Sequence, residues 1–154
     1  MLELDFLKNV RVFHDLNDEQ LKKILSGCKE KEYKHNERLF KEGEKAQYIW
    51  MVIEGQVDIR FELPGRDTSP VTTLYTETPR KTFGWSSFVP PYEYILSAYC
   101  SSQKCRLAQL EKEYLFKLFN SDSEMGYILM SNLAGVMSLR FHDIQTASAS
   151  AHEY

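Results

Sequence analysis

The chain has 154 residues, of which 43% are hydrophobic and 27% charged, and its formal net charge is −3. This length suits a single domain with one core, and the composition is typical of a globular protein. The slightly acidic balance excludes an overall basic field for nucleic acid or anionic lipid. The longest apolar run, at 49–53, is far too short to span a membrane.

The cysteines and the first residues favour a cytoplasmic protein. Cys28, Cys100 and Cys105 are odd in number and lack the paired spacing of a metal site, so we expect reduced and mostly buried thiols. Glu3 and Asp5 stand where a signal peptide would carry basic residues. No membrane association is expected.

Residues 1–28 are predicted to form a helical segment. Asn17 can cap a helix, and Gln20 can reach back to its backbone to complete a capping box. One face at helical spacing then carries Leu21, Ile24, Leu25 and Cys28. The upstream residues expected to pack under the same core are Leu4, Phe6, Leu7, Val12, Phe13 and Leu16.

From about residue 29 to residue 110 the hydrophobic period is two, which indicates strands. In 57–63 the apolar residues alternate with Asp58, Arg60 and Glu62, the pattern of a half-buried strand. Further strands are predicted at 48–53, 71–75, 92–99 and 104–110, punctuated by Gly43, Gly55 and a polar loop at 64–70. Short strands separated by turn residues suggest an all-β barrel or jelly roll.

Residues 111–145 return to helical spacing, with a first helix at 111–119. Ser121 and Glu124 are predicted to form a capping box that starts a long helix ending near residue 145. The apolar face of this helix is wider than packing on one core requires, which favours burial on a second copy as well. The alternative is a helix that lies deeper in its own barrel. The candidate dimer residues are Met125, Ile128, Leu129, Leu133, Val136, Met137 and Ile144. The small residues at 146–151 are expected to fray.

The stretch 82–95 is the candidate ligand site. Gly84 has no side chain, so the backbone can approach another group closely there. Ser86 and Ser87 offer hydroxyls, and a stiff Pro-Pro turn follows them. Tyr92 and Tyr94 lie two apart in a predicted strand and would share a face. The candidate ligand residues are Phe83, Gly84, Trp85, Ser86, Ser87, Tyr92, Glu93 and Tyr94.

Several of these residues also have a purely structural interpretation. Trp85 could stack on a ligand ring or fill the pocket as core, and the neighbouring aromatic residues favour filling. The two serines could cap a helix instead of touching a ligand. Tyr92 and Tyr94 are of a type favoured in strands in any case.

Catalysis and direct DNA binding are not expected. None of the four histidines lies in a strand pattern with a second metal ligand, and neither a nucleophile-with-base motif nor a P-loop occurs. Lys29, Lys31 and Lys34 lie at near-alternate positions, as on a solvated strand face. The predicted organisation is therefore one domain, 1–154, without a DNA-binding module.

Three motifs in series resemble the cyclic nucleotide-binding domain of the Crp/Fnr type. They are 39–44 (LFKEGE), 53–57 (IEGQV) and Phe83-Gly84, and the resemblance covers about 13–145. It implies a double-stranded β-helix, or jelly roll, with a helix before it and a long dimerising helix after it. It also implies that Phe83-Gly84 opens a phosphate-binding cassette and that cyclic AMP or cyclic GMP is the usual ligand.

The resemblance departs from the family pattern in the cassette itself. In such domains a Glu after Phe-Gly binds the ribose hydroxyl and a later Arg pairs with the cyclic phosphate. Here Trp85 occupies the Glu position, the Arg would fall near Tyr92 or Glu93, and neither Arg nor Lys occurs between Lys81 and Lys104. A hydrogen bond to a charged group contributes about 1.5–3 kcal/mol, so we expect weak or no binding of cyclic nucleotides.

Two functions remain open. The first is a small-molecule-sensing regulatory module whose ligand shifts the helices after the barrel and the homodimer that they form. The second is a ligand-free dimerisation or protein-interaction module whose pocket is plugged by aromatic side chains.

Overall fold

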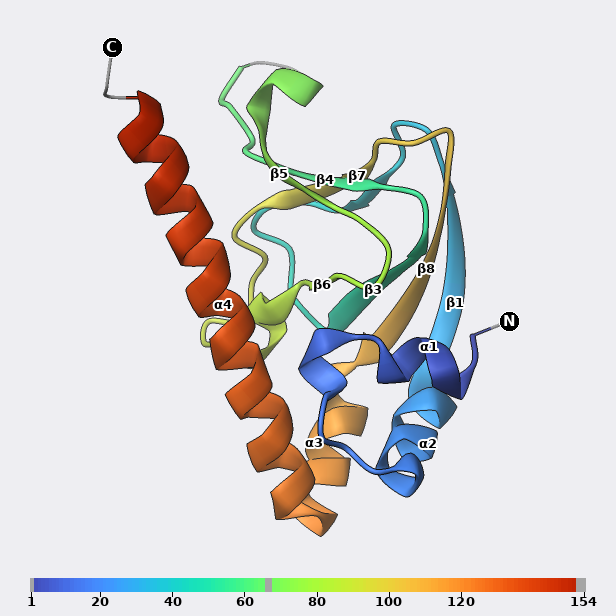
Figure 1. Cartoon of the computed structure of the whole chain (residues 1–154). Coiled ribbons are helices and arrows are strands. Elements are labelled where there is room, and N and C mark those ends of the chain that lie inside the picture. The colour runs from blue at the N-terminus through green and yellow to red at the C-terminus, as the bar shows by residue number, and fades with distance from the viewer. Residues whose placement is uncertain (1, 66–67, 152–154) are drawn as a thin grey trace.

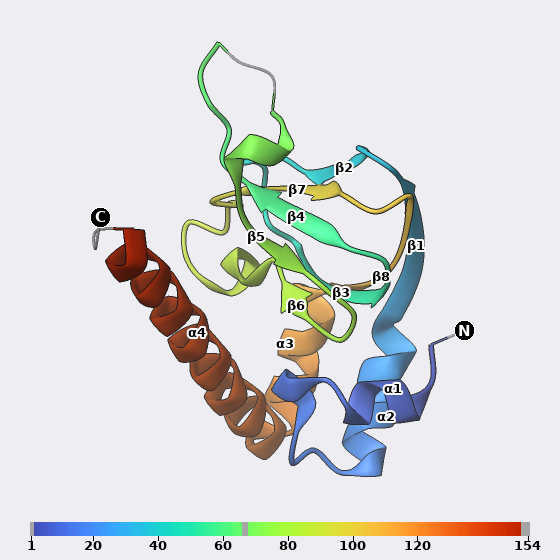
Figure 2. The ribbon, with the colours of Figure 1, turned by 45° about the horizontal axis from the view of Figure 1, so that its top comes forward.

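The computed structural model describes residues 2–65 and 68–151, with the backbone alone after residue 146. Two antiparallel four-stranded sheets form a jelly roll, helices gather at one end of it, and a long helix runs along one side (Figures 1 and 2). The predicted fold class, mainly β with an N-terminal helix and a long C-terminal helix, is confirmed.

Each sheet joins strands that are distant in sequence. The strands are β1 (Cys28–Lys34), β2 (Arg38–Phe40), β3 (Tyr48–Glu54), β4 (Val57–Arg60), β5 (Thr73–Glu77), β6 (Thr82–Phe83), β7 (Ser97–Cys100) and β8 (Lys104–Glu111). One sheet has the order β1-β8-β3-β6 and the other β2-β7-β4-β5. Leu110 of β8 lies opposite Cys28 on one side and opposite Ile49 on the other, so β8 is an interior strand.

The helical elements are α1 (Leu4–Lys8), the 3₁₀ turns η1 (Arg11–Phe13), η2 (Pro70–Thr72) and η3 (Trp85–Phe88), and the helices α2 (Asp18–Gly27), α3 (Lys112–Ser121) and α4 (Ser123–Ala151). Helices α1, α2 and α3 with the turn η1 cover one end of the barrel and α4 covers one side, while the turns η2 and η3 lie elsewhere on the barrel (Figures 1 and 2). The predicted capping box is present. Asn17 Oδ1 accepts from the Gln20 amide at 2.9 Å, and Gln20 Oε1 accepts from the Asn17 amide at 2.9 Å.

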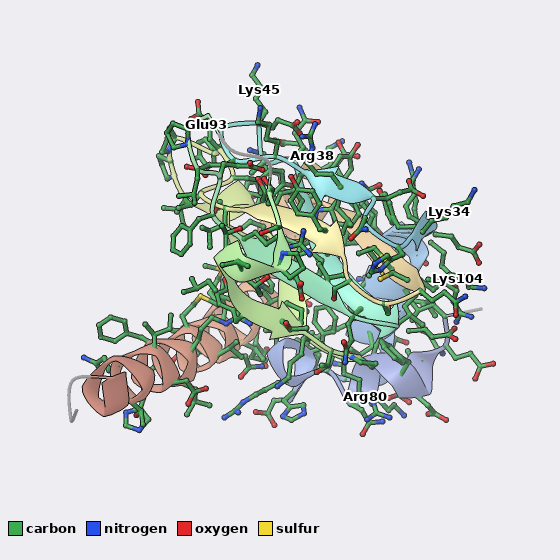
Figure 3. All side chains as sticks on the ribbon, turned by 90° about the horizontal axis from the view of Figure 1, so that it is seen from above. Lys34, Arg38, Lys45, Arg80, Glu93 and Lys104 are labelled. Carbon is green, nitrogen blue, oxygen red and sulfur yellow. The ribbon has the colours of Figure 1, made fainter. Side chains whose placement is uncertain are left out.

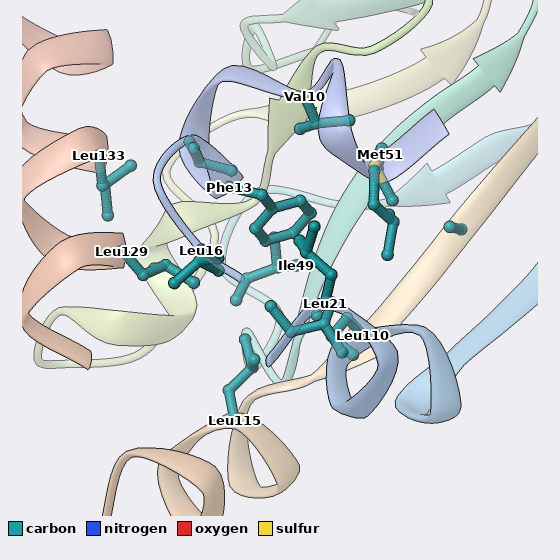
Figure 4. Close-up of a cluster of buried hydrophobic side chains, with 14 of the residues drawn as sticks. Val10, Phe13, Leu16, Leu21, Ile49, Met51, Leu110, Leu115, Leu129 and Leu133 are labelled. Atoms are coloured by element: carbon teal, nitrogen blue, oxygen red, sulfur yellow. The ribbon is translucent and has the colours of Figure 1, made fainter. Parts of the chain in front are cut away.

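An apolar core joins the N-terminal helices, the end of the barrel and α4 (Figure 4). Phe13 and Leu16 from the first helical segment meet Ile49 of β3, Leu115 of α3 and Leu129 of α4. The expected packing of the N-terminal residues under the core is thus observed. This core attaches the first half of α4 firmly to the barrel.

The predicted strand at 57–63 is shorter and more buried than its alternating pattern indicates. β4 ends at Arg60, and both Asp58 and Arg60 are buried. Arg60 pairs with Asp58 at 3.1 Å and lies 4.7 Å over the ring of Tyr99. Asp58 also accepts from Thr76 at 2.8 Å. These cross-strand partners allow the charged face of the strand to be buried, which a single-strand pattern cannot show.

The predicted strand at 92–99 is wrong in its first half, and the strand predicted at 71–75 begins with the turn η2. Regular pairing in the former begins only at Ser97. Tyr92 has a left-handed backbone, with φ of 62°, and this breaks the strand alternation directly after the proline pair. Tyr92 is therefore 40% exposed whereas Tyr94 is only 5% exposed, so the two rings do not share a face.

The start and the end of the long helix also differ from the predictions. Asp122, and not Ser121, is its N-cap, because Asp122 Oδ1 accepts from the Met125 amide at 3.1 Å. The Ser121 hydroxyl donates instead to carbonyl groups of α3. The helical backbone continues to Ala151, through the segment expected to fray. Within the described residues, no helix has the length and apolar character needed to cross a membrane.

Asp122 also joins α4 to α2, since its second oxygen accepts from the Gln20 side-chain amide at 3.0 Å. This hydrogen bond holds the pKa of the Asp122 carboxyl below its usual value. The N-terminus of the long helix is therefore stabilised by an ionised carboxylate.

We predict that Asp122→Ala lowers the thermal midpoint while Ser121→Ala leaves it nearly unchanged. Because the folded-state pKa of Asp122 is depressed, its contribution is complete above the ordinary Asp pKa of about 4 and is lost as the pH falls through the folded value. Thermal scans by circular dichroism over this pH range test the prediction. A larger loss in Ser121→Ala would restore the capping box predicted from the sequence.

Candidate functional site

The cassette begins where β6 ends, and Gly84 is required there for two reasons. Its φ of 83° is in the left-handed region, which side chains disfavour. A Cβ at this position would also lie 2.9 Å from Trp50 Cδ1 and 3.0 Å from the Tyr48 carbonyl oxygen. The close approach expected at Gly84 is therefore made to the protein's own β3.

Aromatic rings fill the interior of the barrel beside the cassette. The rings of Phe40 and Tyr94 stack with centroids 3.7 Å apart, and Trp50 stacks on Phe83 at 6.3 Å. The indole of Trp50 donates to the Tyr94 hydroxyl at 3.2 Å, which itself donates to the Tyr48 carbonyl at 3.1 Å. Burial raises the pKa of Tyr94, so this hydroxyl stays protonated. We call these rings the aromatic floor: Phe40, Trp50, Phe83 and Tyr94.

Trp85 turns away from the aromatic floor toward the helices. Its side chain belongs to the core that contains Leu129 and Leu133 of α4. The indole N–H donates to Thr82 Oγ1 at 3.3 Å, and the ring meets Phe88 edge-on at 5.4 Å. Trp85 thus packs between the cassette and α4, and it is not the residue that fills the barrel.

A cavity of about 380 Å³, the cassette pocket, lies between the aromatic floor, the cassette and α4. Phe40, Phe83 and Tyr94 line it from the barrel, and Ser86 and Glu93 line it from the cassette. The lining residues from α4 are Met130, Leu133, Met137 and Arg140. Its walls are mostly apolar, as is common in small-molecule sites, and its size lies within their usual range.

The structure brings most of the predicted ligand residues to this pocket. Those that line it are Phe83, Gly84, Trp85, Ser86, Glu93 and Tyr94. Ser87 does not line it; this side chain is fully buried, and its hydroxyl has no hydrogen-bond partner among the described residues. Tyr92 points elsewhere too, with its ring 4.1 Å from the Lys112 ammonium group.

The polar group that the sequence reasoning missed comes from α4. Arg140 pairs with the buried carboxylate of Glu77 at the end of β5, and its guanidinium lies 4.5 Å over the ring of Tyr75. Burial raises the pKa of Glu77, although the guanidinium acts in the opposite direction. Arg140 is far from the cassette in sequence, but a cation four residues after Val136 on the packed face of a helix was a usable signal.

Part of the predicted dimer surface is wrong. Met125 and Leu129 have no exposed surface and Leu133 is buried, because all three pack on the N-terminal helices and the barrel. Such side chains cannot meet a second copy. For the first half of α4, the structure therefore agrees with the alternative prediction, in which the helix packs on its own barrel. Ile144 of the predicted set is exposed, and so are four apolar residues of α4 outside that set: Tyr127, Met130, Leu139 and Phe141.

The other chemically reactive groups of the described residues do not assemble into a metal site. Among residues 2–65 and 68–151, no cluster of three or more His, Cys, Asp or Glu side chains is arranged to hold a metal ion. Cys100 and Cys105 are buried and Cys28 is partly buried. Burial raises the pKa of Cys28 and of Cys100 to about 12, so both thiols are neutral and poor nucleophiles.

The chain belongs to the cyclic nucleotide-binding domain family, because the model of this domain matches residues 30–122, more than half of the chain. A candidate cyclic nucleotide-binding protein from Geobacter metallireducens has a similar structure, with a TM-score of 0.77 and 29% identity, covering 92% of this chain and 100% of that one. The resemblance stated from the three motifs is therefore confirmed.

Two further solved structures share the fold. A cyclic nucleotide-binding domain from Methylobacillus flagellatus gives a TM-score of 0.80 at 16% identity, covering 98% of this chain and 83% of that one. The catabolite activator protein of Thermus thermophilus gives a TM-score of 0.69 at 25% identity, covering 91% of this chain and 63% of that one. The comparison with curated protein sequences gives no match.

We predict that Arg140→Met lowers the free energy of unfolding by about 3 kcal/mol, because it leaves the Glu77 carboxylate buried without a partner. The double variant Arg140→Met, Glu77→Gln should recover much of the lost free energy of unfolding. The cost of Arg140→Met should shrink as the pH falls, since the unpaired carboxyl, with its pKa raised further, then becomes protonated.

Urea unfolding of both single variants and the double variant measures the coupling between the two residues. Arg106→Met is the matched control, because Arg106 faces Glu30 and Glu54, each at 3.6 Å, and neither carboxylate is buried. Equal losses for Arg140→Met and Arg106→Met would show that the Glu77 pair has no special role.

Proposed function

We propose that this protein is a non-catalytic, cytoplasmic regulatory module that senses a small apolar molecule in the cassette pocket and binds cyclic nucleotides weakly or not at all. The observation that carries the proposal is the construction of the pocket. Its inner wall is the aromatic floor and its outer wall belongs to α4. A ligand between them contacts the helix directly, so it can change how that helix packs.

The charges around the pocket argue against a cyclic phosphate as the usual ligand. Glu93 contributes a carboxylate to the rim. Arg140 is the only Arg or Lys among the lining residues, and it is already paired with buried Glu77. A phosphate would therefore lose its hydration without gaining a free cation. An uncharged, flat molecule avoids this cost and can stack on the aromatic floor.

The exposed side of α4 supports a homodimer through a set of residues that shares only Met137 and Ile144 with the predicted one. Apolar or small side chains recur there at alternating intervals of three and four, which is the heptad pattern of a two-stranded coiled coil. They are Tyr127, Met130, Ala134, Met137, Phe141 and Ile144, and we call them the seam. Met130 and Met137 also line the cassette pocket. A ligand that moves these two side chains would alter the dimer contact.

A second candidate function is the ligand-free interaction module. The specific observation in its favour is that Phe40, Trp50 and Tyr94 already occupy the barrel interior, joined by stacking and hydrogen bonds. In this case the seam alone would carry the function, and the cassette pocket would stay empty.

Calorimetric titration with 1-naphthol, a flat uncharged probe, separates the two functions. We expect saturable binding to the native protein, its loss in Ser86→Phe, which fills the cassette pocket, and its retention in Ser86→Ala. Failure of the native protein to bind 1-naphthol would leave the interaction module as the better description.

For cyclic AMP we expect little or no binding by the native protein and an increase of about tenfold or more in Glu93→Arg, which supplies a cation at the rim. Glu93→Gln is the control that removes only the negative charge, and its gain should be smaller. Micromolar binding of cyclic AMP by the native protein would contradict the charge argument.

The dimer is tested by sedimentation equilibrium of Phe141→Glu and Leu139→Glu. Both residues are exposed on α4, but only Phe141 belongs to the seam. We expect Phe141→Glu to shift the protein to monomer, because two carboxylates would face each other across the coiled coil, and Leu139→Glu to remain dimeric. A native protein that is monomeric at high concentration removes the dimer altogether.

A further inference from the structure

A second cavity, of about 710 Å³, lies on the other side of the contact between α4 and the barrel. It is bounded by α4, by η1 and by the turn that joins β5 to β6, and we call it the basic groove. It shares only Tyr75 and Arg140 with the cassette pocket. Arg80 projects from this turn on the side of the barrel opposite Glu93 of the cassette (Figure 3). The two cavities are therefore distinct.

One end of the basic groove carries an excess of positive charge. Arg11, Arg80 and Lys81 line it, all three are exposed, and none has an ion-pair partner in the part of the chain that the structure describes. The acids in the lining are Glu77, which is paired with Arg140, and Asp143. Cations that converge on a concave surface raise the local potential and attract anions.

The turn that presents two of these cations is fixed to the sheet. The Arg80 amide donates to the Val52 carbonyl at 2.8 Å, and the Val52 amide donates to the Lys81 carbonyl at 3.0 Å. Both bonds continue the pairing of β3 beyond β6. The backbone positions from which the two side chains extend are thus set before any ligand arrives, which reduces the entropy cost of binding.

The other end of the groove is apolar apart from Asp143. Leu74 of β5 faces Leu139 and Ile144 of α4, and each of these side chains is about two-fifths exposed although it lines a cavity. Val136 and Val12 extend the apolar surface toward the basic end. The part of α4 from Val136 to Ile144 is about 12 Å long at 1.5 Å per residue. This length accommodates a short hydrocarbon chain.

We propose that the basic groove is a second binding site, for a small amphipathic anion with a carboxylate or phosphate head and an apolar tail. Arg11, Arg80 and Lys81 bind the head, with charge-assisted hydrogen bonds from the guanidinium and ammonium groups. Leu74 and Leu139 cover the tail. An inorganic anion would leave the apolar end exposed, and a neutral molecule would leave the cations without partners.

The site is compatible with the proposed dimer. At 100° per residue, Val136, Leu139 and Asp143 lie on the side of α4 opposite Tyr127 and Phe141 of the seam. A second copy seated on the seam would leave the groove open, and only Ile144 belongs to both surfaces. The proposal does not depend on a ligand in the cassette pocket.

Calorimetric titration of the full chain with octanoate, octan-1-ol and inorganic phosphate tests the proposal. We expect saturable binding of one octanoate per chain, with affinity at least tenfold higher than for octan-1-ol or phosphate. Arg11→Glu combined with Lys81→Glu should weaken octanoate at least tenfold. Lys31→Glu with Lys34→Glu makes the same charge change on β1 and should leave octanoate binding unchanged.

The apolar end of the groove is tested by Leu139→Gln, which should also weaken octanoate binding. Val71→Gln, at a site outside both cavities, should leave it unchanged.

Several results would overturn the proposal. Octanoate that fails to bind, or that binds the Arg11→Glu, Lys81→Glu protein as well as the native one, removes the site. If phosphate binds as tightly as octanoate, the apolar tail contributes nothing and the proposal of an amphipathic ligand is wrong. Loss of octanoate in Ser86→Phe would place it in the cassette pocket. If 1-naphthol fails to bind while octanoate behaves as expected, only the proposed function of the cassette pocket is lost.

Discussion

The buried pair between Glu77 and Arg140 is the contact on which the arrangement of the last helix depends. The first half of α4 is secured independently, by Asp122 at its N-cap and by Asn132, whose amide donates to the carbonyls of Val12 and His14 at 3.1 and 2.7 Å. Farther along α4, the pair of Arg140 with Glu77 is the ion pair that joins the helix to the barrel among the residues that the structure describes. Because a buried carboxylate without its partner is strongly destabilising, this pair holds α4 at a set distance from β5.

That distance also sets the shape of both cavities. Arg140 and Tyr75 line each of them, so the pair is a shared wall whose position limits the cassette pocket on one side and the basic groove on the other. The apolar contacts of Leu129 and Leu133 hold the helix at the far end of the cassette pocket. A ligand therefore meets one firmly packed region of α4 and one held mainly by a single polar contact. Regulatory motion is expected at the less firmly held region.

The parts of the fold that the sequence could predict are those determined by local chemistry. The capping box of Asn17 and Gln20, the strand at 104–110 and each of the three motifs depend on residues close together in the chain. The failures have non-local causes. Asp58 and Arg60 are buried because β5 and β7 supply partners, and Tyr92 is turned outward by a backbone conformation that no periodicity reveals. Arg140 reaches the pocket only through the packing of α4, so a search confined to the cassette loop could not find it.

The shared wall has a thermodynamic consequence for the two proposed ligands. Arg140 lines the basic groove as well as the cassette pocket, and its positive charge is already paired with Glu77. An anion in the basic groove would compete with Glu77 for the positive charge and weaken the pair that holds α4 against β5. An uncharged ligand in the cassette pocket makes no such demand and adds apolar contact between the barrel and α4. The two ligands would then act on the helix in opposite senses, and linkage requires that each lower the affinity of the other by the same factor.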